Sequence, residues 1–273
     1  MGLKRVITAV VFIPFFYLMV RYLPPLFFFL FVVVGILIGL REFYQFHYGP
    51  VGSGSITLGL ILGVLVAVSF YRQDLIEGSA LLIGIVLVIL LFHLFFSGNL
   101  GSSLVDSAVM LFGLAYVGWF LSYLILMRGF EDGGMAIFFL FLVTWAGDTG
   151  AYYVGRAIGR YKLSPVVSPN KTIEGAVGGI LTSVLIAFLA RAWFFPALNL
   201  RECLILGLLF GIMGQLGDLV ESMLKRSAGV KDSGTIIPAH GGLLDRVDSL
   251  IFTTPLFYYY LVLVKGYGHA ILI

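Results

Sequence analysis

The densest group of residues that could do chemistry lies late in the chain. Asp218, Glu221, Ser222 and Lys225 are separated by three, one and three positions, so on a helix they fall on one stripe. Acids and a cation are costly in contact with lipid. The spacing therefore predicts that this stripe faces a water-filled cavity or the interior of a helical bundle.

Carboxylates from two neighbouring helices are candidate ligands for a divalent cation. Asp245 and Asp248 are three positions apart at the start of the next apolar segment, so they are predicted to project together and to join Asp218. Carboxylate oxygens favour Mg²⁺, which usually also binds substrate phosphates. The nearby cations suited to phosphates are Lys225, Arg226, Lys231 and Arg246. This set is typical of phosphoryl or nucleotidyl transfer, in which positioning and charge neutralisation carry most of the catalysis.

Two upstream segments add further candidates. Asp148 and Tyr152 are four apart, share one helix face and are followed by Arg156. This pattern indicates either a substrate-binding face or a structural, buried Asp paired with Arg156 or with another span.

The second upstream segment precedes an apolar stretch. Ser168, Lys171 and Thr172 could donate to phosphate oxygens, and free amides at the following helix N-terminus also attract anions. The alternative is an ordinary helix start, with Ser or Thr as N-cap and Glu174 in the first turn. Cap and site are compatible.

The elements that position these residues must lie in a bilayer. The 273 residues are 60% hydrophobic and only 11% charged, whereas soluble domains average about 25% charged residues. The sequence predicts an all-α, polytopic transmembrane bundle of about nine helices. The predicted spans are Val6–Val20, Leu26–Phe46, Ile56–Phe70, Ala80–Phe96, Val105–Met127, Met135–Arg156, Gly175–Phe194, Leu204–Lys225 and Leu250–Val264.

The distribution of Lys and Arg predicts a cytoplasmic N-terminus, because basic residues then concentrate on the inner side. The two longest polar stretches, 156–174 and 226–249, fall on that side, so the site is expected to face the cytoplasm. We interpret the basic start followed by an apolar run as a retained first span. The expected location is a cytoplasmic (inner) membrane. A net charge of +3 is too mild for a nucleic-acid binder.

Two regions are expected, with no linker between them. Residues 1–130 form a transmembrane scaffold and 131–273 carry the chemistry. Glycines four apart, such as Gly207 and Gly211, favour close helix packing. The scaffold could pack within one chain or support a homodimer. Asp106 and His93 are interpreted as packing or helix-end polar groups.

One long pattern carries a family resemblance. It reads Ser222-x2-Lys225-Arg226-x4-Lys231-Asp232-x5-Pro238-x-His240-Gly241-Gly242-x2-Asp245-Arg246-x-Asp248, and it resembles the signature of the phosphatidate cytidylyltransferases, also called CDP-diacylglycerol synthases. The segments 148–156 and 168–175 resemble upstream blocks of the same family. Ala239 departs from the glycine that many members carry.

The resemblance implies that CTP and phosphatidic acid react to CDP-diacylglycerol and pyrophosphate in a membrane, with Mg²⁺ held by Asp218, Asp245 and Asp248. A second, monovalent cation is allowed but not demanded. The implied catalytic residues are Asp218, Asp245, Asp248, Lys225, Arg226 and His240. His240 either orients a phosphate or is a hydrogen-bonded loop residue. The implied substrate-binding residues are Asp148, Tyr152, Ser168, Lys171, Thr172, Glu174, Ser222, Lys231, Asp232, Gly241, Gly242 and Arg246.

Two rival functions fit less well. CDP-alcohol phosphotransferases also use carboxylates and CDP-lipids, but their Asp-Gly-x2-Ala-Arg pattern is absent. A secondary transporter could use Asp148 and Asp218 as ion sites, but this chain concentrates its intramembrane acids in one half.

Overall fold

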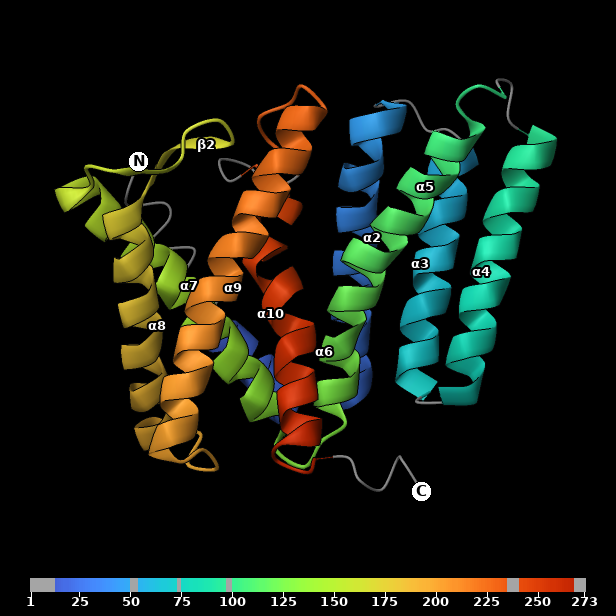
Figure 1. Cartoon of the computed structure of the whole chain (residues 1–273). Coiled ribbons are helices and arrows are strands. Elements are labelled where there is room, and N and C mark those ends of the chain that lie inside the picture. Colours follow the sequence, from blue (N-terminus) through green and yellow to red (C-terminus); the bar gives the residue numbers. More distant parts are fainter. Residues whose placement is uncertain (1–12, 50–53, 73–74, 97–99, 235–240, 268–273) are drawn as a thin grey trace.

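The computed structural model describes residues 13–49, 54–72, 75–96, 100–234 and 241–267, and these are almost entirely helical (Figure 1). The helices are α2 (Pro25–Tyr48), α3 (Gly54–Arg72), α4 (Leu75–Phe96), α5 (Ser103–Gly113), α6 (Phe120–Arg128), α7 (Gly133–Ile158), α8 (Ile173–Trp193), α9 (Leu200–Ser227) and α10 (Leu244–Leu263). A short π-helix, η1 (Leu114–Trp119), joins α5 to α6. The strands are β1 (Lys162–Ser164) and β2 (Ser168–Thr172).

Seven helices among the described residues are long and apolar enough to cross a membrane, so the chain is a multi-pass membrane protein. They correspond to seven of the nine predicted spans, with α5, η1 and α6 forming one continuous segment. The count of nine is not confirmed. The predicted first span, Val6–Val20, begins outside the described residues. Its described part belongs to a helix over residues 13–22. The predicted last span is α10, whose first turns carry charged side chains that lower its hydropathy.

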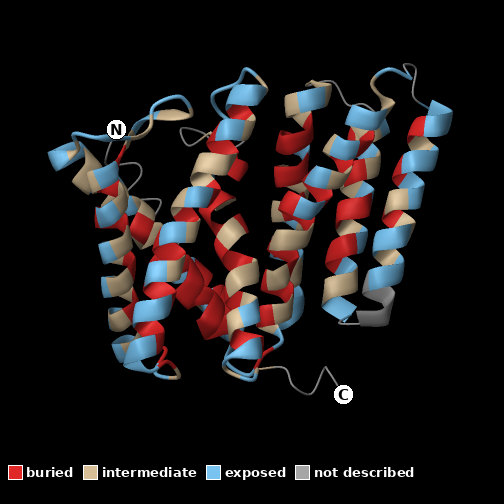
Figure 2. Cartoon of the chain, viewed as in Figure 1, coloured by how far each residue is buried: buried red, intermediate tan, exposed pale blue. Residues whose placement is uncertain are grey.

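Burial separates a central group of helices from a peripheral one (Figure 2). In the most apolar stretch of α7, 61% of residues are buried, against 17% in that of α4. Figure 1 shows α3 and α4 at one edge of the bundle and α8 at the other. The lipid-facing sides of α4 and α8 expose large apolar residues such as Leu94 and Leu181, as expected where the solvent is hydrocarbon.

Small residues allow α7, α8 and α9 to approach closely, as the glycine spacing predicts. A Cβ on Gly207 would lie 2.5 Å from Val184 Cα, and one on Gly211 would lie 2.8 Å from Ile180 Cα. These contacts are with backbone atoms, so neither position has room for a side chain. Packing of α8 against α9 therefore fixes the helix that carries Asp218.

The isolated polar groups of the first half lie at helix contacts, as interpreted from the sequence. Asp106 Oδ1 lies 2.6 Å from His47 Nε2, and His93 Nδ1 lies 3.0 Å from Ser107 Oγ. Each pair satisfies polar atoms between two helices.

A two-stranded hairpin between α7 and α8 is an exception to the predicted all-α fold. β1 and β2 pair antiparallel, with Lys162 opposite Thr172. Thr172 is the N-cap of α8, and its hydroxyl accepts from Gly175 N at 3.1 Å. Glu174 accepts from the backbone N–H groups of Arg160 and Tyr161. The expected helix start is therefore present, and it also anchors the hairpin.

Candidate functional site

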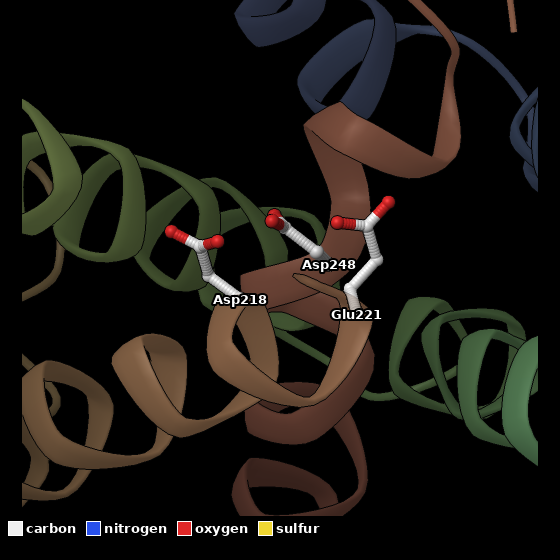
Figure 3. A group of neighbouring side chains, drawn as sticks. All are labelled: Asp218, Glu221 and Asp248. Atoms are coloured by element: carbon white, nitrogen blue, oxygen red, sulfur yellow. The ribbon is translucent and has the colours of Figure 1, made fainter. Parts of the chain in front are cut away.

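Three carboxylates meet where α9 packs on α10 (Figure 3). Asp218 and Glu221 come from α9 and Asp248 comes from α10, and one oxygen of each lies within 4.8 Å of the others. The two α9 residues are three apart, so they leave the helix on one face. Gly217 lets α10 approach that face, because a Cβ there would lie 2.5 Å from Asp248 O. This carboxylate group, Asp218, Glu221 and Asp248, is a candidate metal centre.

Burial and unmet bonding in the carboxylate group fit a cation. Glu221 is fully buried, and neither of its carboxylate oxygens accepts a hydrogen bond from the residues that the structure describes. Lys225 Nζ lies 2.5 Å from Glu221 Oε2, but outside hydrogen-bond geometry. Buried carboxylates need compensating charge, and here only two lysines, Lys171 and Lys225, face the four carboxylates of Asp218, Glu221, Asp245 and Asp248. A divalent ion such as Mg²⁺, which prefers oxygen ligands, would supply it.

The structure does not bring Asp245 into the carboxylate group, although the sequence predicted it as a metal ligand. Its Oδ1 accepts from Lys225 Nζ at 2.5 Å, and its Oδ2 accepts from Gly242 N at 3.0 Å and Ser233 N at 3.1 Å. Asp245 thus lies in the first turn of α10, where it bonds preceding loop amides. Glu221 takes the third place beside Asp218 and Asp248.

A pocket of about 450 Å³ adjoins the carboxylate group and is of the size that holds small ligands. Asp148, Tyr152 and Arg156 of α7 form one wall, and Lys171 and Thr172 of the hairpin form another. The third wall is α9, which contributes Gln215 and Asp218.

Asp218 is shared by the pocket and the carboxylate group. Its Oδ2 lies 2.7 Å from Lys171 Nζ, and its Oδ1 accepts from Ser222 Oγ at 3.4 Å. The hairpin therefore places a cation directly beside the candidate metal centre. An anion bound in this pocket could contact both Lys171 and a bound metal.

Asp148 is linked to α10 rather than to Arg156. Ser249 Oγ donates to Asp148 Oδ1 at 3.3 Å, while Arg156 Nη1 donates to Tyr152 OH at 3.3 Å. Of the two structural pairings predicted for Asp148, the one with Arg156 is not found among the described residues, whereas the bond from Ser249 is a contact with another span. The Arg156 guanidinium lines the pocket near its exposed rim.

The remaining predicted residues that the structure describes line neither the pocket nor the carboxylate group. Ser168 begins β2 opposite Ser164, and Gly241, with φ of 82°, adopts the left-handed conformation that suits glycine. His240 lies outside the described residues. Four of these remaining residues have exposed side chains, namely Arg226, Lys231, Asp232 and Arg246.

The sequence predicts Glu221 on the polar stripe but not among the site residues, and it does not predict a role for Gln215 or Ser249. Gln215 is three residues before Asp218, so the same helical spacing pointed to it. Its amide nitrogen donates to Ala176 O and Gly211 O, which bridges α8 and α9 at the pocket wall. Ser249 follows Asp248 directly and carried no separate signal.

Comparison with known proteins gives relatives that are about half identical to this chain over the matched part. The chain is 52% identical over 107 residues to the uncharacterized protein YnbB of Escherichia coli K12, covering 39% of this chain and 36% of that protein. It is 52% identical over 102 residues to a phosphatidate cytidylyltransferase of Staphylococcus epidermidis, covering 37% and 39% of the two chains. A Synechocystis phosphatidate cytidylyltransferase is 53% identical over 111 residues, 40% of this chain and 37% of that protein. The matches thus span about two-fifths of the length of these relatives.

A family model covers nearly the whole chain. The model described as the cytidylyltransferase family matches residues 3–264, a range that contains the hairpin, the pocket and the carboxylate group. The chain therefore belongs to the cytidylyltransferase family.

Proposed function

We propose that the chain transfers the cytidylyl group of CTP to phosphatidic acid, giving CDP-diacylglycerol and pyrophosphate. The observation that carries this proposal is the carboxylate group of Asp218, Glu221 and Asp248 beside a pocket that holds Lys171. Family membership and relatives named phosphatidate cytidylyltransferase support the choice of substrates.

In the proposed reaction, a phosphate oxygen of phosphatidic acid attacks the α-phosphorus of CTP. The bond from that phosphorus to the oxygen bridging to the β-phosphate breaks, and pyrophosphate leaves. A phosphate monoester has a second pKa of about 6, so the nucleophile is already ionised near neutral pH. The chain therefore has no need of a general base for this step.

The protein's contribution is to position phosphates and to balance their charge. Asp218, Glu221 and Asp248 would hold Mg²⁺, which when bound neutralises phosphate charge and favours pyrophosphate departure. Lys171 and Arg156, which line the pocket, bind phosphate oxygens. Lys225 holds Asp245 and lies beside Glu221, so it stabilises the acidic centre.

A matched set of variants tests this assignment. Asp218→Asn keeps the size of the side chain but weakens the metal site, and we expect CTP-dependent product formation to fall at least about 100-fold, as when an essential charged group is lost. Asp248→Asn, which alters another carboxylate of the same group, is expected to have the same effect. Asp132→Asn is the control, because Asp132 precedes Asp148 by 16 positions, about 24 Å along a helix, and is exposed.

The assay incubates purified protein with radiolabelled CTP and phosphatidic acid in detergent micelles, with Mg²⁺ or with EDTA. Label in the lipid phase only when Mg²⁺ is present supports the proposal. Wild-type protein that yields no labelled lipid overturns it, and ion-coupled uptake by the same protein in vesicles would indicate a transporter instead.

We propose further that the site faces the cytoplasm in a cytoplasmic membrane, where CTP is available. The hairpin and the loop after α9 carry exposed basic residues, among them Lys162 and Lys231, which supports this orientation. Lys231→Cys in a Cys203→Ser background should react with an impermeant maleimide in inverted vesicles and not in right-side-out vesicles. The reverse pattern would refute the orientation.

The wider architecture forms part of the same proposal. The pocket and the carboxylate group involve only residues from 148 to 248, which supports a scaffold at 1–130 and a catalytic region at 131–273. A span at the N-terminus and α10, added to the seven apolar helices, would give the nine transmembrane helices that the sequence predicts. The exposed apolar edge at α4 would suit the interface of a homodimer. Cross-linking in native membranes tests whether two chains associate.

A further inference from the structure

One buried carboxylate in the N-terminal half reaches the start of α10. Glu42 lies in α2, an apolar helix, and only 1% of it is exposed. Its Oε1 accepts from Leu243 N at 3.0 Å, and its Oε2 accepts from Leu244 N at 2.8 Å and Ser233 Oγ at 3.1 Å. An ionisable residue in a membrane helix is costly and usually has a functional reason.

Glu42 acts as the N-terminal cap of α10. The cap residue Leu243 has no side-chain acceptor of its own, so the first free amides of the helix need an external partner. A carboxylate at this end is also favoured by the helix dipole. Glu42 therefore fixes where α10 begins, and the first two turns of α10 carry Asp245 and Asp248.

A second route connects Glu42 to Asp245 through Ser233. The Ser233 hydroxyl donates to Glu42 and accepts from Asp245 N at 3.3 Å, while Ser233 N donates to Asp245 Oδ2. Gly234 and Gly242 leave room for the carboxylate, because a Cβ on either would lie 2.6 Å from a Glu42 oxygen. Residues 233–234 and 242–244, which flank positions 235–240 in the sequence, thus pack against the Glu42 carboxylate.

We propose that Glu42 is a positioning residue for the transfer reaction, which holds the start of α10 so that Asp248 meets Asp218 and Glu221 and Asp245 meets Lys225. The inference rests on the proposed function. Glu42 acts through the backbone of α10 and through Ser233 on groups that contact substrate or metal. The N-terminal region thereby supplies part of the catalytic geometry in addition to its packing.

Glu42→Gln is the primary test, because it keeps the side-chain size while replacing one acceptor oxygen with an N–H₂ group that faces N–H donors. Glu202→Gln is a matched control. Glu202 also caps a helix, accepting from Asn199 N at 2.7 Å and from Lys265 Nζ at 3.1 Å, but at the start of α9, the end away from the site (Figure 1).

Both variants are expected to unfold at lower temperature in detergent. Only Glu42→Gln should require more Mg²⁺ for half-maximal activity and lose about 10- to 100-fold in kcat/KM for CTP, the range seen when supporting partners of metal ligands are removed. A folded Glu42→Gln protein with wild-type Mg²⁺ dependence and kcat/KM overturns the inference. If Glu42→Gln does not fold, Ser233→Ala, which removes one of the three donors, must show the same shift in direction.

A measurement that does not depend on enzyme activity separates the positioning role of Glu42 from the proposed transfer function. In hydrogen exchange, the amides of Leu243 and Leu244 should exchange faster in Glu42→Gln than in wild type, and unchanged exchange contradicts the capping role. Wild-type protein without transfer activity defeats the proposed function and the inference that rests on it. If the wild type is active and Glu42→Gln has the same Mg²⁺ dependence, kcat/KM and amide exchange, only the inference about Glu42 fails and the proposed function stands.

Discussion

Removal of the Lys225 ammonium should destabilise the fold more than loss of any exposed cation. Lys225 Nζ lies 2.5 Å from both Glu221 and Asp245, and the three side chains are 10%, 0% and 13% exposed. Breaking a buried ion pair by removing one partner costs about 3–5 kcal/mol, because the other charge stays buried without compensation. Lys225→Met leaves two such carboxylates, so we expect a loss at the upper end of this range.

The measurement is unfolding by SDS in mixed micelles with EDTA present, followed by fluorescence of the three tryptophans. EDTA keeps a divalent ion from compensating Glu221. Lys231→Met, at an exposed position, is the control and should change the unfolding free energy by less than about 0.5 kcal/mol.

A double variant tests whether the loss comes from the two uncompensated carboxylates. Asp245→Asn removes one of the two uncompensated charges, so Lys225→Met with Asp245→Asn should be more stable than Lys225→Met alone. The reasoning fails if the double variant gains nothing, or if Lys225→Met matches the control. Either result would mean that the ion pair contributes no more than a surface contact.

Three further predictions concern the metal, the helix packing and the hairpin. Chelation of divalent ions by EDTA should stop formation of labelled lipid, and added Mg²⁺ should restore it. Gly207→Ala should lower the unfolding free energy by about 1–3 kcal/mol through overpacking against α8, whereas Gly84→Ala, which has open space around its Cβ, should not; equal effects would contradict the close approach. Thr172→Ala should cost about 1 kcal/mol as a lost N-cap and raise the KM for CTP, because Lys171 precedes it; an unchanged KM in the radiolabel assay would count against a phosphate role for Lys171.

The helices could be predicted from the sequence because hydrophobic length dominates in a bilayer. Seven predicted spans match seven helices to within a few residues. The hairpin at 162–172 could not be predicted this way, since its strands are short and polar. The N-cap of α8 was predictable from Thr172 and Glu174, because capping is a local property of sequence.

The candidate site was predictable only in part. Helical spacing indicated that Asp218 and Glu221 share a face, but which carboxylates converge depends on how α10 docks, and this is tertiary information. Asp245 has the right spacing from Asp248, yet its carboxylate bonds loop amides and Lys225 beside Glu221 and does not join Asp218 and Asp248. Glu42 was a missed signal, since an acid within an apolar span is itself informative.

The bond between Glu42 and the start of α10 joins positions about two hundred residues apart, and this has a consequence for biosynthesis. A growing polypeptide inserts α2 early, with its carboxylate still lacking the amides that it later accepts from. Those amides exist only after residue 244 has left the ribosome and its helix has entered the bilayer. Every translation product that stops before residue 243 therefore lacks the two backbone donors of Glu42, together with the two aspartates that the first turns of α10 carry.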